Sequence, residues 1–313
     1  MTADPADPAT PADPATRRDP LPSRDSRYPD AGSGPGSGVA DSGGRGGGGG
    51  GRGGGARGGG GGAVLVTGAS GGIGGAVARR LAAEFPGSPL VLGYRSTEPV
   101  ALADELSVAG RAAECVRLAP GTGPGDDDEV ARSIDGIGTR HGGIRVLAHC
   151  AGPHVPMVHL SRIAPAEMRR QLDDDAAGFF SIVHPALPHL RSAGGNIVAV
   201  TTAATTRYPV RDGLSAAPKG AVEQLVRGLA AEEGRFGVRV NCVGPGMLTD
   251  GMAERLIASG ELDGIALEVT LGNIPLGRFG TAVDIAEAVA FLASGRAGFI
   301  SGQKLDVDGG YGA

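Results

Sequence analysis

The chain has 313 residues, a formal net charge of −5 and three cysteines. The net charge is negative and the sequence shows no basic face, so nucleic acid is not expected as the main partner. No apolar run is long enough to cross a bilayer, and residues 1–30 lack the apolar centre of a signal peptide. We therefore expect a cytoplasmic protein without a membrane partner. The cysteines lack the spacing of metal ligands, so we expect reduced thiols and no metal site.

Residues 1–62 differ in composition from the rest of the chain. A proline-rich repeat of the ADPAT type is followed by a mixed-charge stretch and then by glycine runs that arginines interrupt. Such a composition predicts a disordered leader, because it offers almost no apolar surface to bury. An arginine–glycine tract can also bind RNA, but no aromatic side chain accompanies this one. A flexible leader, or translation from upstream of the true start, is the favoured interpretation, which leaves residues 63–313 as one folded domain.

The folded part is organised around residues 63–74, AVLVTGASGGIG. The first residues predict a buried parallel strand, and the glycines then turn the chain tightly into a helix. The first amides of that helix have no intrahelical partners, and the positive end of the helix dipole lies there. Glycine also lets a ligand approach the backbone closely. We expect a dinucleotide to bind here through Gly68, Ser70, Gly72, Ile73 and Gly74.

Residues 89–94 predict the second strand, and Arg95 and Ser96 follow it. In dinucleotide folds this point lies beside the adenosine ribose, where an acid favours NAD(H) and an arginine accommodates the 2′-phosphate of NADP(H). No acid is present, so Arg95 predicts NADP(H) as the cofactor. An ordinary solvated arginine at a strand end is the alternative.

Strands continue to alternate with helices along the chain. We expect further strands at 112–118, 144–149, 196–200 and 237–243, with the last strand and its turn at 304–310. Helices are expected through 76–81, at 100–109, from 126, at 165–189, from 215 and at 284–292. This alternation predicts a single α/β domain with a Rossmann-like, doubly wound parallel sheet of seven strands. Residues 247–278 have apolar side chains scattered among glycines and are expected to form a mobile cover over the substrate.

Several motifs in this order resemble the short-chain dehydrogenase/reductase family, and most of all its β-ketoacyl-carrier-protein reductase branch. The TGxxxGxG loop matches residues 67–74, and residues 149–152 stand where the family has Asn-Asn-Ala-Gly. The Pro-Gly cofactor loop matches 241–246, and the C-terminal signature matches 274–280 with 307–310. The resemblance implies further cofactor contacts from Cys150, Ala151, Gly152, Lys219, Pro245, Gly246 and Leu248. It also implies a small-molecule substrate and a homotetramer that packs through the helices near 165–190 and 215–230.

The family's catalytic tyrosine is absent. The lysine that follows it by four residues aligns with Lys219, and Ser215 then stands at the position of the tyrosine. The resemblance places Thr202 at the serine that orients the carbonyl and Asp175 at the asparagine of the proton relay. Leu118 replaces the family's adenine-contacting aspartate. An aliphatic hydroxyl is a much weaker acid than a phenol, so Ser215 is a poor proton donor by itself.

Three other sources of the proton remain open. Tyr208 lies in a loop that borders the active site in the family, and its phenol can swing into the vacant position. His149 or His154 lies near the expected nicotinamide edge. Lys219 is the third source, because an ammonium freed of its tyrosine can itself act as an acid.

These patterns predict an NADP(H)-dependent oxidoreductase with an atypical proton donor. The expected substrate is a carbonyl, an alcohol or a conjugated double bond in an acyl or secondary-metabolite molecule. The alternative is a protein of the same fold that binds cofactor without redox chemistry, as a dehydratase, isomerase or cyclase, or as a non-catalytic partner subunit. A third and weaker interpretation assigns the function to the arginine–glycine tail.

Overall fold

The computed structural model describes residues 61–121, 125–153, 155–250, 268–269 and 271–313. The predicted leader lies outside the described residues except for its last two glycines. Residues 251–267 and 270 of the expected substrate cover, and His154, also lie outside them. In the described part of the chain, no helix is long and apolar enough to cross a membrane.

Seven strands form one sheet in the order β3-β2-β1-β4-β5-β6-β7, and all neighbours are parallel. The strands are β1 Ala63–Thr67, β2 Leu90–Tyr94, β3 Ala113–Arg117, β4 Ile144–His149, β5 Asn196–Val200, β6 Arg239–Pro245 and β7 Lys304–Val307. The predicted seven-stranded, doubly wound parallel sheet is confirmed. The strand order reverses between β1 and β4, and ligands bind in such sheets at the carboxyl ends of the strands beside that point.

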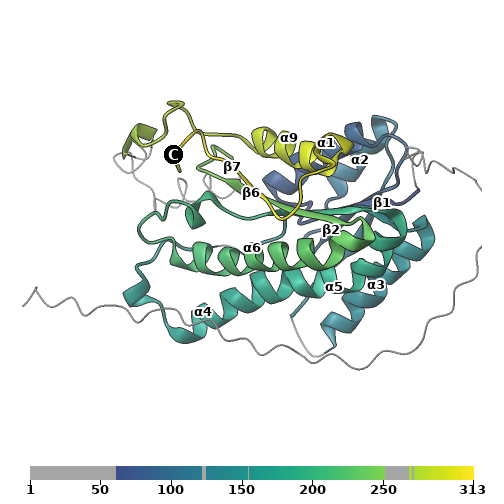
Figure 1. Ribbon diagram of the computed structural model, residues 1–313, viewed down its shortest axis with the longest axis horizontal. Helices are drawn as coiled ribbons and strands as arrows, with labels where there is room; N and C mark the ends of the chain where they lie inside the picture. The colour runs from purple at the N-terminus through teal and green to yellow at the C-terminus, as the bar shows by residue number, and fades with distance from the viewer. Residues whose placement is uncertain (1–60, 122–124, 154, 251–267, 270) are drawn as a thin grey trace, which may run out of the picture. The chain divides into compact units, whose positions relative to one another are not determined.

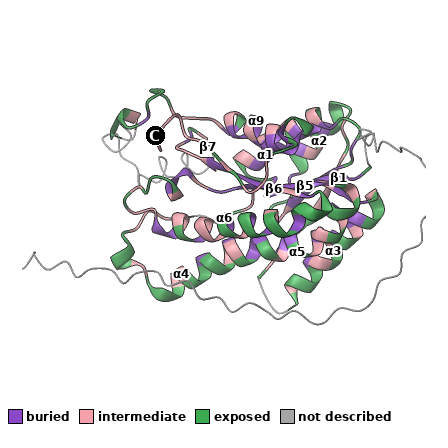
Figure 2. Ribbon diagram, viewed as in Figure 1, coloured by how far each residue is buried: buried purple, intermediate pink, exposed green. Residues whose placement is uncertain are grey.

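Helices cover both faces of the sheet (Figure 1). One face carries α1 Gly72–Glu84, α2 Val100–Val108 and α9 Ala282–Ala293, and the opposite face carries α3 Asp126–His141, α5 Gly178–Ala193 and α6 Gly213–Glu233. The central strands are therefore buried along almost their whole length instead of on alternate residues, and all five residues of β1 are buried. Figure 2 shows the same division, with buried residues on the sheet and on the helix surfaces that face it.

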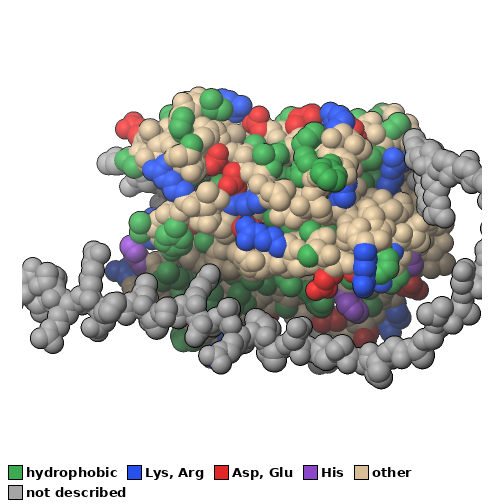
Figure 3. Space-filling view, viewed as in Figure 1, with side chains coloured by type: hydrophobic (Ala, Val, Ile, Leu, Met, Phe, Trp, Pro, Cys, Tyr) green, Lys and Arg blue, Asp and Glu red, His purple; other side chains and the backbone are tan. Residues whose placement is uncertain are grey.

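Two apolar clusters hold these layers together. The first joins α1 and α9 to the sheet through residues such as Leu81 and Val289. The second joins α3, α5 and α6 to the other face through Ile134, Phe179 and Val226. On the surface shown in Figure 3, Lys and Arg side chains are interspersed with Asp and Glu.

The predicted long helix over 165–189 is present, but it contains a π-helical turn. Helix α4 spans Pro165–Leu172, a π-helical turn spans Asp173–Ala177, and α5 begins at Gly178. In that turn the Gly178 N–H bonds to the carbonyl of Asp173, five residues earlier. Within this turn Asp173 is exposed and Asp175 is buried. Such turns are frequent at functional sites, and this one positions a predicted site residue.

Candidate active site

The turn between β1 and α1 has the geometry of a phosphate cradle. Gly68 has φ +67°, and a Cβ there would lie 2.7 Å from the Ala151 amide nitrogen. A Cβ on Gly74 would lie 2.1 Å from the Gly68 carbonyl oxygen. Only glycine fits at both positions. Gly71 caps α1 without a side-chain bond, and the first turn of α1 holds no acidic residue, so its amides are free to bind an anion.

The three polar residues predicted to bind the cofactor at the glycine turn and beyond β2 lie at the surface. Ser70 and Ser96 are exposed, and the Arg95 side chain is 47% exposed at the carboxyl end of β2. Arg95 Nη2 lies 3.0 Å from Asp174 Oδ1, a residue of the π turn. Leu118 is buried beneath them, and its side chain would lie 3.0 Å from a Cβ on Gly93. It therefore fills the core at the position where the family has a polar adenine contact.

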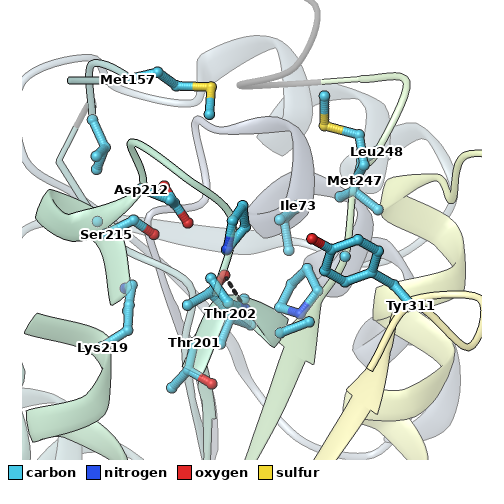
Figure 4. A pocket seen from close by; sticks show the side chains of 18 of the residues that line it. Ile73, Met157, Thr201, Thr202, Asp212, Ser215, Lys219, Met247, Leu248 and Tyr311 are labelled. Atoms are coloured by element: carbon cyan, nitrogen blue, oxygen red, sulfur yellow. Dashed lines mark hydrogen bonds between the residues drawn. The ribbon is translucent and has the colours of Figure 1, made fainter. Parts of the chain in front are cut away.

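A cavity of about 370 Å³ opens beside the cradle. Its walls include predicted cofactor residues that the fold collects from four parts of the chain: Ile73, Cys150, Ala151, Gly152, Lys219, Pro245, Gly246 and Leu248. Four of the five predicted catalytic residues also line it: Asp175, Thr202, Ser215 and Lys219. In Figure 4, Ser215 and Lys219 project from one side of the cavity, with Thr202 at its base.

Lys219 and Asp175 form an ion pair at this cavity. Lys219 Nζ lies 2.7 Å from Asp175 Oδ1, and the two side chains are 13% and 1% exposed. A Cβ on Gly152 would lie 3.2 Å from the same Nζ atom, so the ammonium also borders the loop after β4. The ammonium is therefore engaged by a carboxylate, and this arrangement does not favour Lys219 as a free proton donor.

The hydroxyls of Thr202 and Ser215 complete the polar base of the cavity. Thr202 follows β5, and its Oγ1 accepts a bond of 3.2 Å from the Ala204 amide. The Thr202 hydroxyl proton remains available to a ligand, because that bond uses only the oxygen as an acceptor. Ser215 lies in the first turn of α6, one helical turn before Lys219. The spacing of these two residues on the helix is the one that the sequence predicts.

Two of the proposed proton sources do not line this cavity. Tyr208 is 48% exposed and is not among the residues that line the cavity. His149 is buried between β4 and α5, where its ring contacts Phe179 and its Nδ1 lies 3.0 Å from Thr67 Oγ1. Burial, and secondarily the charge of Lys219, lower the pKa of His149 to about 3. A neutral, enclosed imidazole at this place supports the core.

The cavity residues that sequence reasoning missed include Asp212 and Tyr311. Tyr311 follows the C-terminal Asp-Gly-Gly turn, and Figure 4 shows its phenol on the wall opposite Ser215. The Arg207 guanidinium covers its ring at 4.5 Å from the centroid. Asp212 immediately precedes α6. The position of Asp212 just before a predicted helix was visible in the sequence. An aspartate there ordinarily indicates a helix-capping residue and not a residue of the site.

Cys150 also lines the cavity, directly after β4. Burial raises the pKa of its thiol to about 12, although the nearby Lys219 charge opposes this shift. The protonated thiol is a poor nucleophile, so the chemistry of the cavity rests on its hydroxyl, amine and carboxyl groups.

A glycine cradle at the switch point of a parallel sheet, with a lysine- and hydroxyl-lined cavity beside it, defines a dinucleotide-binding protein of the Rossmann type. Comparison with known proteins agrees with this class. The family model described as enoyl-(acyl carrier protein) reductase matches residues 68–312. The chain belongs to the short-chain dehydrogenase/reductase family of oxidoreductases.

Relatives and solved structures align with the whole folded part. The chain is 32% identical over 251 residues to L-fucose dehydrogenase of Rattus norvegicus, covering 79% of this chain and 88% of that protein. It is 32% identical over 249 residues to 3-oxoacyl-[acyl-carrier-protein] reductase of Staphylococcus aureus, covering 79% and 97%. A short-chain dehydrogenase from Burkholderia cenocepacia in complex with NADP superposes with a TM-score of 0.69 at 29% identity, covering 80% of this chain and 97% of that one.

Proposed function

We propose that this protein is an NADP(H)-dependent oxidoreductase that transfers a proton without the family's tyrosine. The observation that carries the proposal is the shared cavity, which places Lys219, Thr202 and Ser215 beside the loop after β4 and the start of α1. The nicotinamide cofactor, when bound, supplies or accepts the hydride. The chain's own groups then have to hold the cofactor, orient the substrate oxygen and exchange one proton with it.

The choice of NADP(H) over NAD(H) rests on Arg95. Its guanidinium lies at the carboxyl end of β2, about half exposed, and the neighbouring Ser96 is exposed as well. A guanidinium makes paired, charge-assisted bonds to phosphate. Its present partner is Asp174 Oδ1 at 3.0 Å, a carboxylate that competes with the phosphate for Arg95. The relative from Burkholderia cenocepacia is a complex with NADP, which supports the same choice.

The substrate oxygen is expected between the hydroxyls of Thr202 and Ser215. Thr202 orients that oxygen by donating a hydrogen bond to it, because its Oγ1 accepts from a backbone amide and keeps the O–H free. Lys219 stands one turn further along α6, where the resemblance assigns it to the nicotinamide ribose. Its ion pair with Asp175 fixes the ammonium at this place.

The cavity walls favour a mainly apolar carbonyl compound. Above the polar base, the lining includes Val155, Met157, Met247 and Ile274. These side chains suit the apolar part of an acyl or alicyclic substrate. The hydroxyl groups of a sugar would find no hydrogen-bond partners among them. We therefore favour the substrate type of the 3-oxoacyl reductase over that of the fucose dehydrogenase. A conjugated double bond remains within this class.

The assay that tests the proposal uses three probes. Ethyl 4-chloroacetoacetate and acetoacetyl-coenzyme A are offered with NADPH, and L-fucose is offered with NADP⁺, while the absorbance of the reduced nicotinamide is followed. Turnover with either acyl probe, faster with NADPH than with NADH, supports the proposal. Conversion of a probe without any change in the reduced nicotinamide would instead establish a non-redox function.

That second candidate, a dehydratase, isomerase or cyclase, is favoured by one observation. Ser215 occupies the tyrosine position while the cofactor cradle remains intact. Mass spectrometry of the probe after incubation separates the two candidates, because reduction adds two hydrogens and isomerisation adds none.

Self-association through α5 and α6 is part of the proposal. A shallow apolar groove runs along the outer surfaces of these helices, lined by Phe180, Ala221, Gln224, Leu225, Gly228, Leu229 and Glu232. Phe180 is 43% exposed there. Small residues beside an exposed aromatic ring allow a second pair of helices to approach closely, which supports a homotetramer.

A further inference from the structure

Asp212 stands at the N-cap of α6, yet its side chain does not cap the helix. Its backbone carbonyl accepts the first helical bonds, from the amides of Ser215 at 3.1 Å and Ala216 at 2.9 Å. The residue before it, Arg211, has φ +77° and is the one non-glycine residue with positive φ in the described part of the chain. Such a conformation is costly and needs support from its surroundings. Here it accompanies a carboxyl group that lines the cavity instead of the helix end.

The Asp212 carboxyl and the Ser215 hydroxyl lie close together on one wall of the cavity (Figure 4). Ser215 occupies the position of the missing tyrosine, so an acidic group lies beside the hydroxyl that is expected to face the substrate. Burial raises the pKa of Asp212 to about 6, against the lowering effect of the neighbouring Ser215 side chain. A carboxyl group in this range is partly protonated near neutral pH and can give up its proton readily.

We propose that Asp212 is the proton source of the reaction and that the Ser215 hydroxyl passes its proton to the substrate oxygen. This inference rests on the proposed oxidoreductase function. In reduction, the Ser215 O–H bond breaks as the proton joins the substrate alkoxide. The Asp212 O–H bond breaks in turn, and its proton restores the serine hydroxyl. Asp212 is left as a carboxylate that takes a proton from water, and oxidation of an alcohol runs the same transfers backwards.

Other charged and titratable groups share these surroundings. The same cavity is lined by Cys150, Asp175, Lys219, Asp250 and Tyr311, and Tyr208 and Arg211 belong to the loop that carries Asp212. Asp175 and Lys219 compensate each other's charge through their ion pair. Asp250 accepts the Ala282 amide at 3.0 Å, at the start of α9. Asp212 differs from both carboxylates because it faces the hydroxyl at the tyrosine position.

The first experiment reads the carboxyl directly, without cofactor or substrate. The full chain is labelled with ¹³C at the aspartate side-chain carboxyl carbon, and its NMR spectrum is followed against pH. We expect one resonance with a midpoint near pH 6 that is absent in D212N and is displaced in S215A. The exposed D135N, on α3 outside the cavity, is the matched control and should leave this resonance unchanged.

The second experiment measures reduction of ethyl 4-chloroacetoacetate by NADPH. D212N should lower kcat by roughly 10²–10⁴-fold, the usual contribution of a general acid, while NADPH binding stays intact. D212E should recover part of the rate, since it restores the carboxyl group. The native rate should fall as pH rises through about 6, because reduction uses the protonated form of Asp212.

A restored tyrosine gives the sharpest comparison. S215Y supplies a phenol of its own, so the further change D212N should cost much less in this background than in the native one. Equal losses in both backgrounds would show that Asp212 only supports the fold, and would overturn the inference. The inference would also be overturned if D212N turned substrate over at the native rate, or if the Asp212 resonance titrated like that of a free aspartate. Failure of the native protein to bind NADPH would instead overturn the proposed function itself.

Discussion

Lys219 Nζ lies 2.7 Å from Asp175 Oδ1, and this pair joins the π turn before α5 to the first turns of α6. The two segments meet at the base of the cavity, where the lysine would otherwise be an unpaired charge. A carboxylate at this position fixes the ammonium without the tyrosine that the family usually supplies. The pair therefore links the stability of the fold to the geometry of the site.

Breaking this pair should destabilise the protein. D175N keeps the shape of the side chain but leaves the Lys219 ammonium without its counter-charge, and we expect a loss of about 3 kcal/mol in the free energy of unfolding. Urea unfolding measures the change. The exposed Arg79–Glu105 pair provides the control, since E105Q should leave the midpoint unchanged. A D175N protein as stable as the native one would show that water already solvates the ammonium.

Arg95 should determine the preference between the two cofactors. R95A removes the guanidinium expected to bind the 2′-phosphate, so NADPH should bind roughly 10–100-fold more weakly, the equivalent of about 1.5–3 kcal/mol, while NADH binding stays the same. Fluorescence titration of the reduced nicotinamide measures both constants. R79A, which removes an exposed arginine of α1, serves as the control. D174N should slightly tighten NADPH binding, because it frees Arg95 from a competing carboxylate. Equal losses for both cofactors would refute the assignment.

The glycine cradle should tolerate no side chain. In G74A the new methyl group would meet the Gly68 carbonyl oxygen at 2.1 Å, so the turn has to open. We expect a loss of about 1–3 kcal/mol in stability and roughly tenfold weaker NADPH binding. G87A is the matched control, because nothing lies within 4 Å of a Cβ at that position. Thermal unfolding with and without NADPH separates the two effects.

Asp212 should make stability depend on pH in a defined window. Its pKa is raised from 3.8 to about 6 in the folded protein, so the folded state holds the proton more tightly than the unfolded chain. Its contribution is therefore fully present below pH 3.8 and is lost as pH rises to about 6. The side chain introduced by D212N carries no proton that rising pH can remove. At pH values above this range, the free energy of unfolding of D212N should therefore exceed that of the native protein. We expect a difference of about 1–2 kcal/mol after allowance for the partial solvent exposure of the side chain. Thermal unfolding at pH 5 and pH 8 checks the sign, and a difference between the two proteins that does not change with pH would contradict it.

Substitution of Phe180 should disrupt self-association. F180D places a charge in the apolar groove on α5 and α6, where a second copy would have to bury it. Sedimentation velocity should then show a smaller species than the native protein forms. V108D, at the exposed end of α2, is the control, because Val108 is 91% exposed outside this groove. An unchanged sedimentation coefficient in F180D would exclude this surface as the interface.

The sequence by itself determined the fold and the cofactor cradle. Both depend on local patterns: uninterrupted apolar strands require cover on two faces, and the spacing of Gly68 and Gly74 leaves room for a backbone turn that no other residue fits. The four-residue spacing of Ser215 and Lys219 likewise determined that their side chains lie on the same face of α6.

The tertiary structure alone decided how protons and charges are placed in the cavity. The resemblance placed Asp175 at the site, but the π turn that carries it and its ion pair with Lys219 could not be recognised from a helical pattern. The loop before α6 was equally undetermined, because it exposes Tyr208 and directs Asp212 into the cavity through the unusual backbone of Arg211. Loop conformations are set by the elements on which they pack, so the sequence pattern alone could not place these two side chains.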